Sequence, residues 1–256
     1  MLLAIDIGNS NVVWGLFRQQ SWTGPWRLVA DQSRTAKEYG HDLIDRLCGV
    51  GLAPAQITDV ILCSVVPNLT PVFEQMAEAV FHRKPLVASP DMDTGLTLLY
   101  TNPRELGADR LVTAAAAYDR YKTSLIVVDL GTATTFSVVT QSGEYLGGVI
   151  APGIGISAKV LSEKTAQLPV VDLVPPKTVI GRDTGSSIQS GLLYGHASLV
   201  DGIVTRVQDE LGQKALVVAT GGFASLVAPL SRTIKEIRPN LTLEGLELLH
   251  RRIVRR

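Results

Sequence analysis

A strand-turn-strand segment that occurs twice constrains the fold of this chain more than any other feature. Residues 2–17, LLAIDIGNSNVVWGLF, align without a gap with residues 125–139, LIVVDLGTATTFSVV. In each copy an apolar run, typical of a buried strand, reaches an aspartate (Asp6 or Asp129), and a glycine turn leads into a returning strand. Self-similarity at a fixed offset indicates duplicated structural units. The copies lie 123 positions apart in a chain of 256 residues, so we expect two related lobes that face one another.

Strand-like and helical runs alternate through the chain, which favours an α/β fold with mixed sheets. We place the lobe boundary near residue 120, giving an N-terminal lobe of residues 1–120 and a C-terminal lobe of residues 121–256. The expected strands are 2–7, 12–18, 26–30, 59–66, two within 124–139, one in YLGGVIAP and one opening 215–227; the expected helices are 36–50, 71–81, 104–121 and 187–211.

Composition excludes several classes of protein. Twenty-four basic residues balance twenty-four acidic ones, so no overall field favours nucleic acid or a membrane surface. No apolar run reaches the roughly 18 residues that a membrane span needs, and the N-terminal run does not resemble a secretion signal. Cys48 and Cys63 lie in apolar contexts, so we expect buried thiols and a cytoplasmic protein. The four histidines are scattered, which argues against a metal site built from them.

The two turns have the chemistry of a nucleotide-phosphate site. Glycine turns leave backbone N–H groups available and let a ligand approach closely. An acidic side chain repels phosphate unless a cation lies between them, so Asp6 at the end of its strand indicates Mg²⁺ bound with a nucleotide. Alternatively, Asp6 and Asp129 only start tight turns; their occurrence in both copies favours the functional interpretation. No Walker-type phosphate loop is present, and GIGISA, residues 153–158, lacks the context of a dinucleotide site.

A second constellation lies in LGADRLVTA, residues 106–114. Asp109 and Arg110 place a carboxylate beside a guanidinium at the start of a helix. This pair suits a substrate with a hydroxyl and a carboxylate: Arg110 binds the carboxylate, and Asp109 accepts the hydroxyl proton during phosphoryl transfer. The alternative is structural, because an aspartate is favoured in the first turn of any helix.

Six motifs, taken in order, resemble those of the type III pantothenate kinases: DIGNSN, GADR, DLGTATT, GGVIAPG, GRDTGSSIQSGLLYG and ATGG. That family belongs to the acetate and sugar kinase/Hsp70/actin superfamily, which implies two duplicated ribonuclease H-like or actin-like lobes with a cleft between them. It also implies ATP-dependent phosphorylation of pantothenate to 4′-phosphopantothenate, the first step of coenzyme A synthesis. Ser10 stands where threonine is commoner in the family, a change that keeps the hydroxyl.

The resemblance implies a role for each matching residue. Asp109 is the general base, and Asp129 binds a monovalent cation, K⁺ or NH₄⁺. Substrate binding is implied for Tyr100, Gly107, Ala108, Asp109, Arg110 and Thr184. ATP binding, with Asp6 serving Mg²⁺, is implied for Asp6, Ile7, Gly8, Asn9, Ser10, Asn11, Val12, Val13 and Thr132. A homodimer is implied as well, with the helix at 187–211 in its interface.

Simpler interpretations stay open for several of these residues. In these interpretations Tyr100 only caps a loop, Thr132 only satisfies turn backbone, and Thr184 is the N-cap of the long helix. Two other functions stay open for the whole chain. One is a kinase or phosphohydrolase acting on another small molecule, and the other is a nucleotide-binding regulatory accessory protein without catalytic activity.

Overall fold

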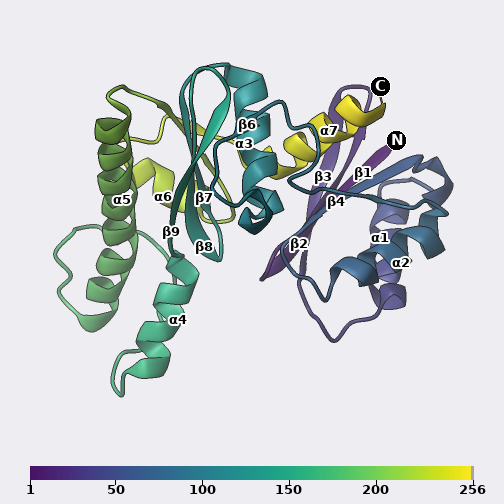
Figure 1. The fold of residues 1–256 in the computed structure, drawn as a ribbon. Coiled ribbons are helices and arrows are strands. Elements are labelled where there is room, and N and C mark those ends of the chain that lie inside the picture. The colour runs from purple at the N-terminus through teal and green to yellow at the C-terminus, as the bar shows by residue number, and fades with distance from the viewer. Residues whose placement is uncertain (255–256) are drawn as a thin grey trace. The chain divides into compact units, whose positions relative to one another are not determined.

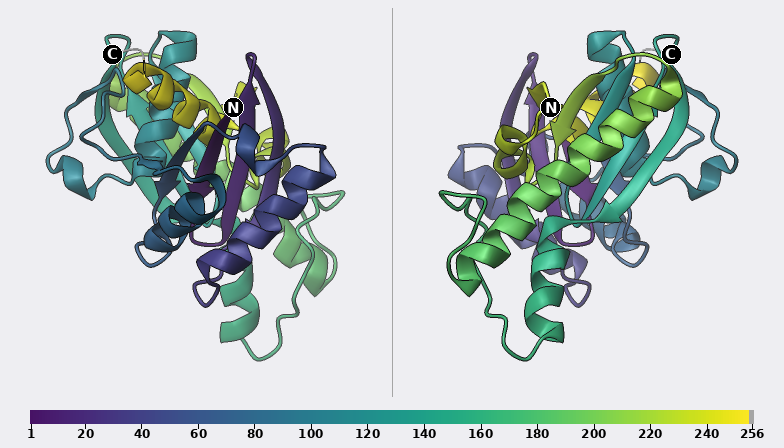
Figure 2. Two further views of the ribbon diagram at one scale, coloured as in Figure 1. Left: turned by 90° about the vertical axis from the view of Figure 1, so that its right-hand side faces the viewer. Right: turned by 90° about the vertical axis from the view of Figure 1, so that its left-hand side faces the viewer.

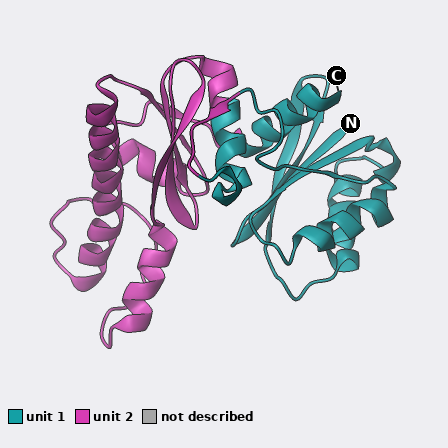
Figure 3. Cartoon of the chain, in the orientation of Figure 1, with its two compact units in different colours: residues 1–95, 102–116, 242–256 teal, residues 96–101, 117–241 magenta. Residues whose placement is uncertain are grey.

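The computed structural model describes residues 1–254 and divides into two compact units (Figure 3). Unit 1 contains residues 1–95 and 102–116 and the C-terminal segment from residue 242. Unit 2 contains residues 96–101 and 117–241. The expected single boundary near residue 120 therefore lies close to one crossing of the chain, but it omits the return of the C-terminal segment to unit 1. That return has a packing cause: a Leu243 methyl lies 3.2 Å from where a Cβ on Gly15 would be.

Unit 1 is built on a five-stranded sheet in the order β3-β2-β1-β4-β5 (Figure 1). Strand β1 pairs antiparallel with β2 and parallel with β4, and β3 is longer than expected. The helices α1 and α2 pack on each other and on one face of this sheet. The strand bounds are β1 Leu2–Ile7, β2 Asn11–Arg18, β3 Ser21–Val29, β4 Asp59–Ser64 and β5 Leu86–Val87.

Unit 2 is built on a six-stranded sheet in the order β11-β10-β7-β8-β9-β6. Strand β7 pairs antiparallel with β8 and parallel with β10. The long helix α5 runs across one face of this sheet (Figure 2, right) and buries an apolar stripe there. The strand bounds are β6 Thr97–Leu98, β7 Leu125–Leu130, β8 Ala133–Val139, β9 Glu144–Pro152, β10 Leu216–Thr220 and β11 Glu236–Ile237.

The helices largely follow the apolar periodicity of the sequence. A capping box starts α1, where the Thr35 hydroxyl accepts from Glu38 N and the Glu38 carboxylate accepts from Thr35 N, the arrangement that satisfies two backbone donors reciprocally. The helix α4 was not predicted from the sequence. The bounds are α1 Ala36–Gly49, α2 Thr70–Phe81, α3 Ala108–Tyr121, α4 Ile154–Lys164, α5 Thr184–Leu211, α6 Ala224–Val227 and α7 Leu241–Val254.

The two sheets repeat one topology, which confirms the duplicated α/β architecture. The order β3-β2-β1-β4-β5 corresponds to β9-β8-β7-β10-β11, with the same parallel and antiparallel pairs. The gapless alignment is wrong after the turn, however. Four residues separate the paired Ile7 and Val12, whereas three separate Leu130 and Thr134. Because side chains alternate between the faces of a strand, a one-residue error reverses every assignment beyond it.

None of the helices within residues 1–254 has both the length and the apolar character needed to cross a membrane.

Candidate active site

The first turn follows β1 and is held by backbone hydrogen bonds on two sides. Gly8 N donates to Asn11 O at 3.0 Å, closing the turn, and Ala30 N donates to Ser10 O at 3.1 Å. Asp6 lies half-buried one residue before the end of β1. The turn is therefore held by one backbone hydrogen bond within itself and one from the residue after β3, and a carboxylate lies at its base.

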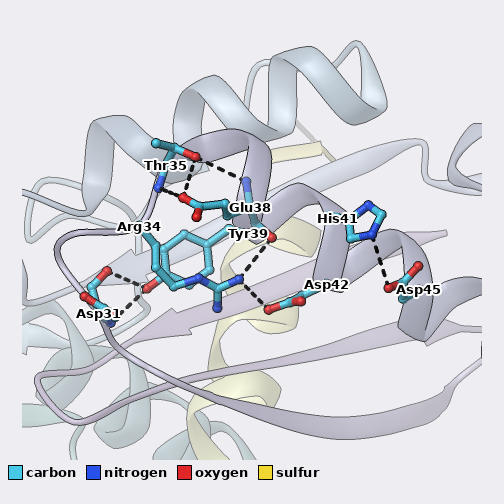
Figure 4. A network of polar contacts seen from close by, with 8 residues as sticks. All are labelled: Asp31, Arg34, Thr35, Glu38, Tyr39, His41, Asp42 and Asp45. Atoms are coloured by element: carbon cyan, nitrogen blue, oxygen red, sulfur yellow. Dashed lines mark hydrogen bonds and ion pairs between the residues drawn. The ribbon is translucent and has the colours of Figure 1, made fainter.

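A network on α1 supports this turn from outside (Figure 4). The buried Tyr39 hydroxyl accepts from Asp31 N and donates to Asp31 O, both at 2.9 Å. The Arg34 guanidinium stacks on the Tyr39 ring at 4.5 Å and forms an ion pair with Asp42 at 2.6 Å. Because Asp31 follows Ala30 directly, Tyr39 fixes the peptide next to the one that binds Ser10. This support was not predicted, because the sequence shows Tyr39 only as an ordinary buried position of an amphipathic helix.

Asp109 lies in the first turn of α3, as the sequence predicts. Its Oδ1 accepts from Arg110 N at 2.7 Å, and its backbone oxygen accepts from the Thr113 hydroxyl at 2.9 Å. Burial raises the pKa of the Asp109 carboxyl, although the Arg110 N–H and the Arg110 charge act in the opposite direction. A Cβ on Gly107 would lie 2.5 Å from Asp109 Oδ1. Any residue other than glycine at this position would therefore displace the Asp109 carboxylate.

Cys63 lies near both Asp6 and Asp109 inside unit 1. It is fully buried on β4, where the parallel register pairs it with Asp6. Burial raises the pKa of the Cys63 thiol well above its usual range, and the charges of Asp6 and Asp109 raise it further. Both carboxylates are therefore near the same thiol, at the carboxyl end of β1 and β4. The prediction of a buried thiol is confirmed for Cys63 and wrong for Cys48, which is exposed; the two acidic groups near Cys63 were not predicted.

The second turn, in unit 2, is packed against a glycine. Gly131 N donates to Ala133 O at 3.0 Å and closes the turn. Asp129 pairs in register with Thr220 on β10, and Gly221 follows directly with a φ of +92°. A Cβ on Gly221 would lie 2.6 Å from the carbonyl carbon and oxygen of Leu130 and closer still to Asp129 Oδ1. Gly221 therefore allows the backbone after β10 to pass directly beside the Asp129 carboxylate.

A second glycine packs on the same turn from the end of β9. A Cβ on Gly153 would lie 2.5 Å from Gly131 O and closer still to Thr132 O. Two sequence patterns contain Gly153, a weak dinucleotide motif and the family motif GGVIAPG, and neither indicated this contact. In the structure it is the residue before α4, and its missing side chain lets α4 begin against the turn.

The two remaining substrate candidates also lie in unit 2. The Tyr100 ring is half-buried and meets the Tyr145 ring edge-on, with centroids 6.2 Å apart. Thr184 is the first residue of α5, but it is not the N-cap. That position belongs to Asp183, whose carboxylate accepts from Ser186 N at 2.8 Å. The structural alternative for Thr184 is therefore wrong, because the preceding aspartate already caps the helix.

The predicted site residues thus fall into two groups. Asp6 to Val13 and Gly107 to Arg110 lie in unit 1, whereas Tyr100, Asp129, Thr132 and Thr184 lie in unit 2. Within residues 1–254 no cluster of three or more His, Cys, Asp or Glu side chains could hold a metal ion by itself. A hollow of about 730 Å³ between α1 and α2, lined in part by Arg34, His41 and Val80, contains none of the predicted residues.

Comparisons with known proteins agree with these features. Residues 2–206 match the family model described as type III pantothenate kinase. The type III pantothenate kinase of Anaeromyxobacter sp. strain Fw109-5 is 51% identical over 253 residues, covering 98% of this chain and 99% of that protein. The one of Geobacter sulfurreducens is 49% identical over 255 residues, with 98% and 99% covered.

Solved structures share the fold at low sequence identity. A conserved putative Baf family transcriptional activator from Campylobacter jejuni superposes with a TM-score of 0.63 at 18% identity, covering 99% of this chain and 100% of that one. A ROK family glucokinase from Streptomyces griseus gives 0.53 at 11% identity, with 98% and 99% covered. These likenesses, with that to the archaeal actin homologue Ta0583 at a TM-score of 0.50, confirm the actin-like and sugar-kinase-like fold. The family match and the two near-full-length relatives show that the chain belongs to the type III pantothenate kinase family.

Proposed function

We propose that this chain transfers the γ-phosphoryl group of ATP to the primary hydroxyl of pantothenate, giving 4′-phosphopantothenate at the start of coenzyme A synthesis. The observation that carries the proposal is the Asp109 carboxyl, which is half-buried, has a raised pKa and lies near the same thiol as Asp6. One acidic group then serves the acceptor and the other serves the phosphate donor, as phosphoryl transfer requires.

Asp109 acts as the general base. It accepts the proton of the attacking hydroxyl while the oxygen attacks the γ-phosphorus, and ADP leaves with the electron pair of the broken P–O bond. A raised pKa makes a carboxylate a stronger base. Arg110, which is only 8% exposed, binds the pantothenate carboxylate, since a guanidinium suits planar bidentate recognition. Tyr100 and Thr184 complete the substrate site.

Residues Asp6 to Val13 and Thr132 bind ATP. The Gly8 turn approaches phosphate oxygens with its backbone, and the Asn9, Ser10 and Asn11 side chains add donors. A single carboxylate, Asp6, fits Mg²⁺ because this ion takes its other ligands from phosphate oxygens and water. When bound, Mg²⁺ offsets the negative charge of the transferring phosphoryl group.

Asp129 binds the monovalent cation, K⁺ or NH₄⁺. The support is the position of this half-buried carboxylate at the second turn, where Gly221, which has no Cβ, lets the backbone pass directly beside its Oδ1. The readout is the potassium dependence of turnover: Asp129→Asn should raise the K⁺ concentration needed for half-maximal activity.

We also propose a cytoplasmic homodimer. Nine of the 14 exposed large apolar side chains within residues 1–254 lie between Leu146 and Ile180, in β9, α4 and the segment that follows, a concentration that suits burial against a second copy. Sedimentation of the purified chain tests the dimer: a monomer at micromolar concentration would contradict it.

The activity itself is tested by ADP formation across a panel of acceptors. With ATP, Mg²⁺ and K⁺ present, pantothenate should release ADP at a rate far above that with glucose, acetate or no acceptor. Turnover with another acceptor instead would favour a different small-molecule kinase. Tight ATP binding without acceptor-dependent ADP release would favour a regulatory accessory protein.

A further inference from the structure

A buried polar pair joins α5 to the second turn of unit 2. His196 Nε2 lies 2.7 Å from Thr134 Oγ1. The Thr134 side chain is fully buried, and His196 is 6% exposed. His196 lies on the stripe of α5 that packs on the sheet, and Thr134 is the first residue of β8 to pair across the turn, opposite Leu130. The pair is therefore a direct link between a long helix and the end of a predicted phosphate-binding turn.

The repeat shows that the fold does not need this pair. With the turn lengths taken from the strand registers, Thr134 corresponds to Val12, which pairs with Ile7 as Thr134 pairs with Leu130. Val12 is also fully buried. An apolar side chain fills the position in one unit, whereas the other unit buries a hydroxyl and an imidazole among apolar residues. Burying polar groups is unfavourable unless they are bonded to each other, so a stability role alone does not explain their presence.

The surroundings show what the pair holds in place. The turn between Leu130 and Thr134 has only three residues and one closing hydrogen bond, from Gly131 N to Ala133 O. Gly153 packs against its carbonyl groups on one side. On the other side, Thr134 Oγ1 lies 2.7 Å from His196 Nε2 of α5. His196 thus fixes the end of the turn from α5.

We propose that His196 is a positioning residue for ATP binding, which acts through Thr134 to hold residues 131–133 in the conformation that contacts the nucleotide phosphates. The inference rests on the proposed function, because it takes Thr132 as an ATP contact. His196 does not touch the nucleotide in this account.

The pair also makes nucleotide binding sensitive to acid. Burial lowers the pKa of His196, so the ring is neutral at pH 7 and its Nε2 can accept the Thr134 hydroxyl proton. A protonated ring can only donate, so the Thr134 hydroxyl must then turn to accept, and a charge is buried among apolar residues. The pKa of His196 is lowered by burial alone. No charged group contributes to this shift, neither Asp129 on β7, nor Lys159, Glu163 and Lys164 on α4, nor Asp201 on α5.

Four single variants and one double variant test the role, with the KM for ATP and the Kd for Mg-ATP as readouts. His196→Phe leaves the buried hydroxyl without its partner, and we expect the KM for ATP to rise about tenfold, the equivalent of one hydrogen bond, with little change in kcat. Thr134→Val should do the same. Thr134→Ser keeps the hydroxyl, and His196→Gln places an amide near the Nε2 position, so both should stay within about threefold of the unaltered chain.

The double variant Thr134→Val/His196→Phe separates positioning from stability. Removing both partners restores an apolar contact, so the Tm should recover most of what each single variant loses. The KM for ATP should nevertheless stay raised. Recovery of the KM together with the Tm would overturn the proposal, as would a His196→Phe variant with an unaltered KM.

The pH dependence provides an independent readout. As the pH is lowered from 7, the Kd of the unaltered chain should rise more steeply than that of His196→Gln, because only the imidazole can become charged. Parallel curves would refute the role of His196. Failure of the proposed function looks different: the unaltered chain would then form no ADP with pantothenate, while calorimetric Mg-ATP binding would still report on His196.

Discussion

Replacing Gly221 with alanine should displace the Asp129 carboxylate and weaken activation by K⁺. Gly221 has a φ of +92°, and its Cβ would lie 2.6 Å from both the carbonyl carbon and the oxygen of Leu130. Carbon atoms pack best at about 3.5–4.0 Å. The backbone after β10 must therefore move by roughly 1 Å away from β7, and the Asp129 carboxylate, whose Oδ1 would lie closer still to the new Cβ, must turn aside.

The stability cost has two parts that a second glycine separates. A left-handed conformation costs a residue with a Cβ about 1–2 kcal/mol, and overpacking adds about 1–3 kcal/mol. Gly212, the C-cap of α5, has a φ of +64° but nothing within 4 Å of its Cβ position. Gly212→Ala should therefore lose only the first part, whereas Gly221→Ala should lose both.

The assay is pantothenate-dependent ADP formation at increasing K⁺ concentration, with thermal unfolding of both variants alongside. A misplacement of about 1 Å in a catalytic group can cost about 10²-fold in rate, so we expect a loss of that order for Gly221→Ala. Gly212→Ala should retain the K⁺ activation curve of the unaltered chain. Identical K⁺ curves for the two variants would refute the argument, because the backbone strain is common to both and the crowding of Asp129 is not.

Two further predictions concern unit 1. Tyr39→Phe keeps the ring but loses both bonds to Asp31, so the loop that holds Ser10 should loosen and the KM for ATP should rise several-fold, with about 1 kcal/mol lost per bond; an unaltered KM beside a lowered Tm would contradict the link. Asp109→Asn should stabilise the chain at pH 7. Folding raises the pKa of the Asp109 carboxyl. The free energy of unfolding therefore falls as the pH rises from the unfolded-state pKa to the folded-state pKa. Asparagine carries no charge and avoids this loss. Thermal unfolding between pH 4 and pH 8 measures the difference, and a lower Tm at pH 7 would show that the carboxylate is not held at an energetic cost.

Strong local patterns allowed the scaffold of the site to be predicted from the sequence. The apolar runs that became β1, β4, β7 and β10 are buried on both faces, so composition alone identifies them. The aspartates at the ends of β1 and β7 are visible because a carboxylate interrupts an apolar run. Asp109 is found at the start of α3 because helix N-termini have a recognisable sequence.

Long-range contacts were not predictable in the same way. The difference between a four-residue and a three-residue turn depends on backbone hydrogen bonds, and the gapless alignment hid it. His196 and Thr134 are 62 positions apart, and each alone reads as an unremarkable residue of an amphipathic element. Asp183 takes the N-cap of α5 because its carboxylate reaches Ser186 N, a choice between neighbours that propensity leaves open. The helix α7 shows the same limit, since its amphipathic pattern does not say which sheet it covers.

The most direct test of the central claim compares Asp109→Asn with Asp119→Asn, a change of a half-buried acid in the last turn of the same helix that forms an ion pair with Lys122 at 3.0 Å. Single-turnover ADP formation with saturating ATP and pantothenate reports the chemical step. If Asp109 takes the hydroxyl proton, its replacement should lower the rate about 10²–10⁴-fold with nearly unaltered Mg-ATP affinity, while Asp119→Asn keeps the full rate. A near-normal rate in Asp109→Asn would contradict the account.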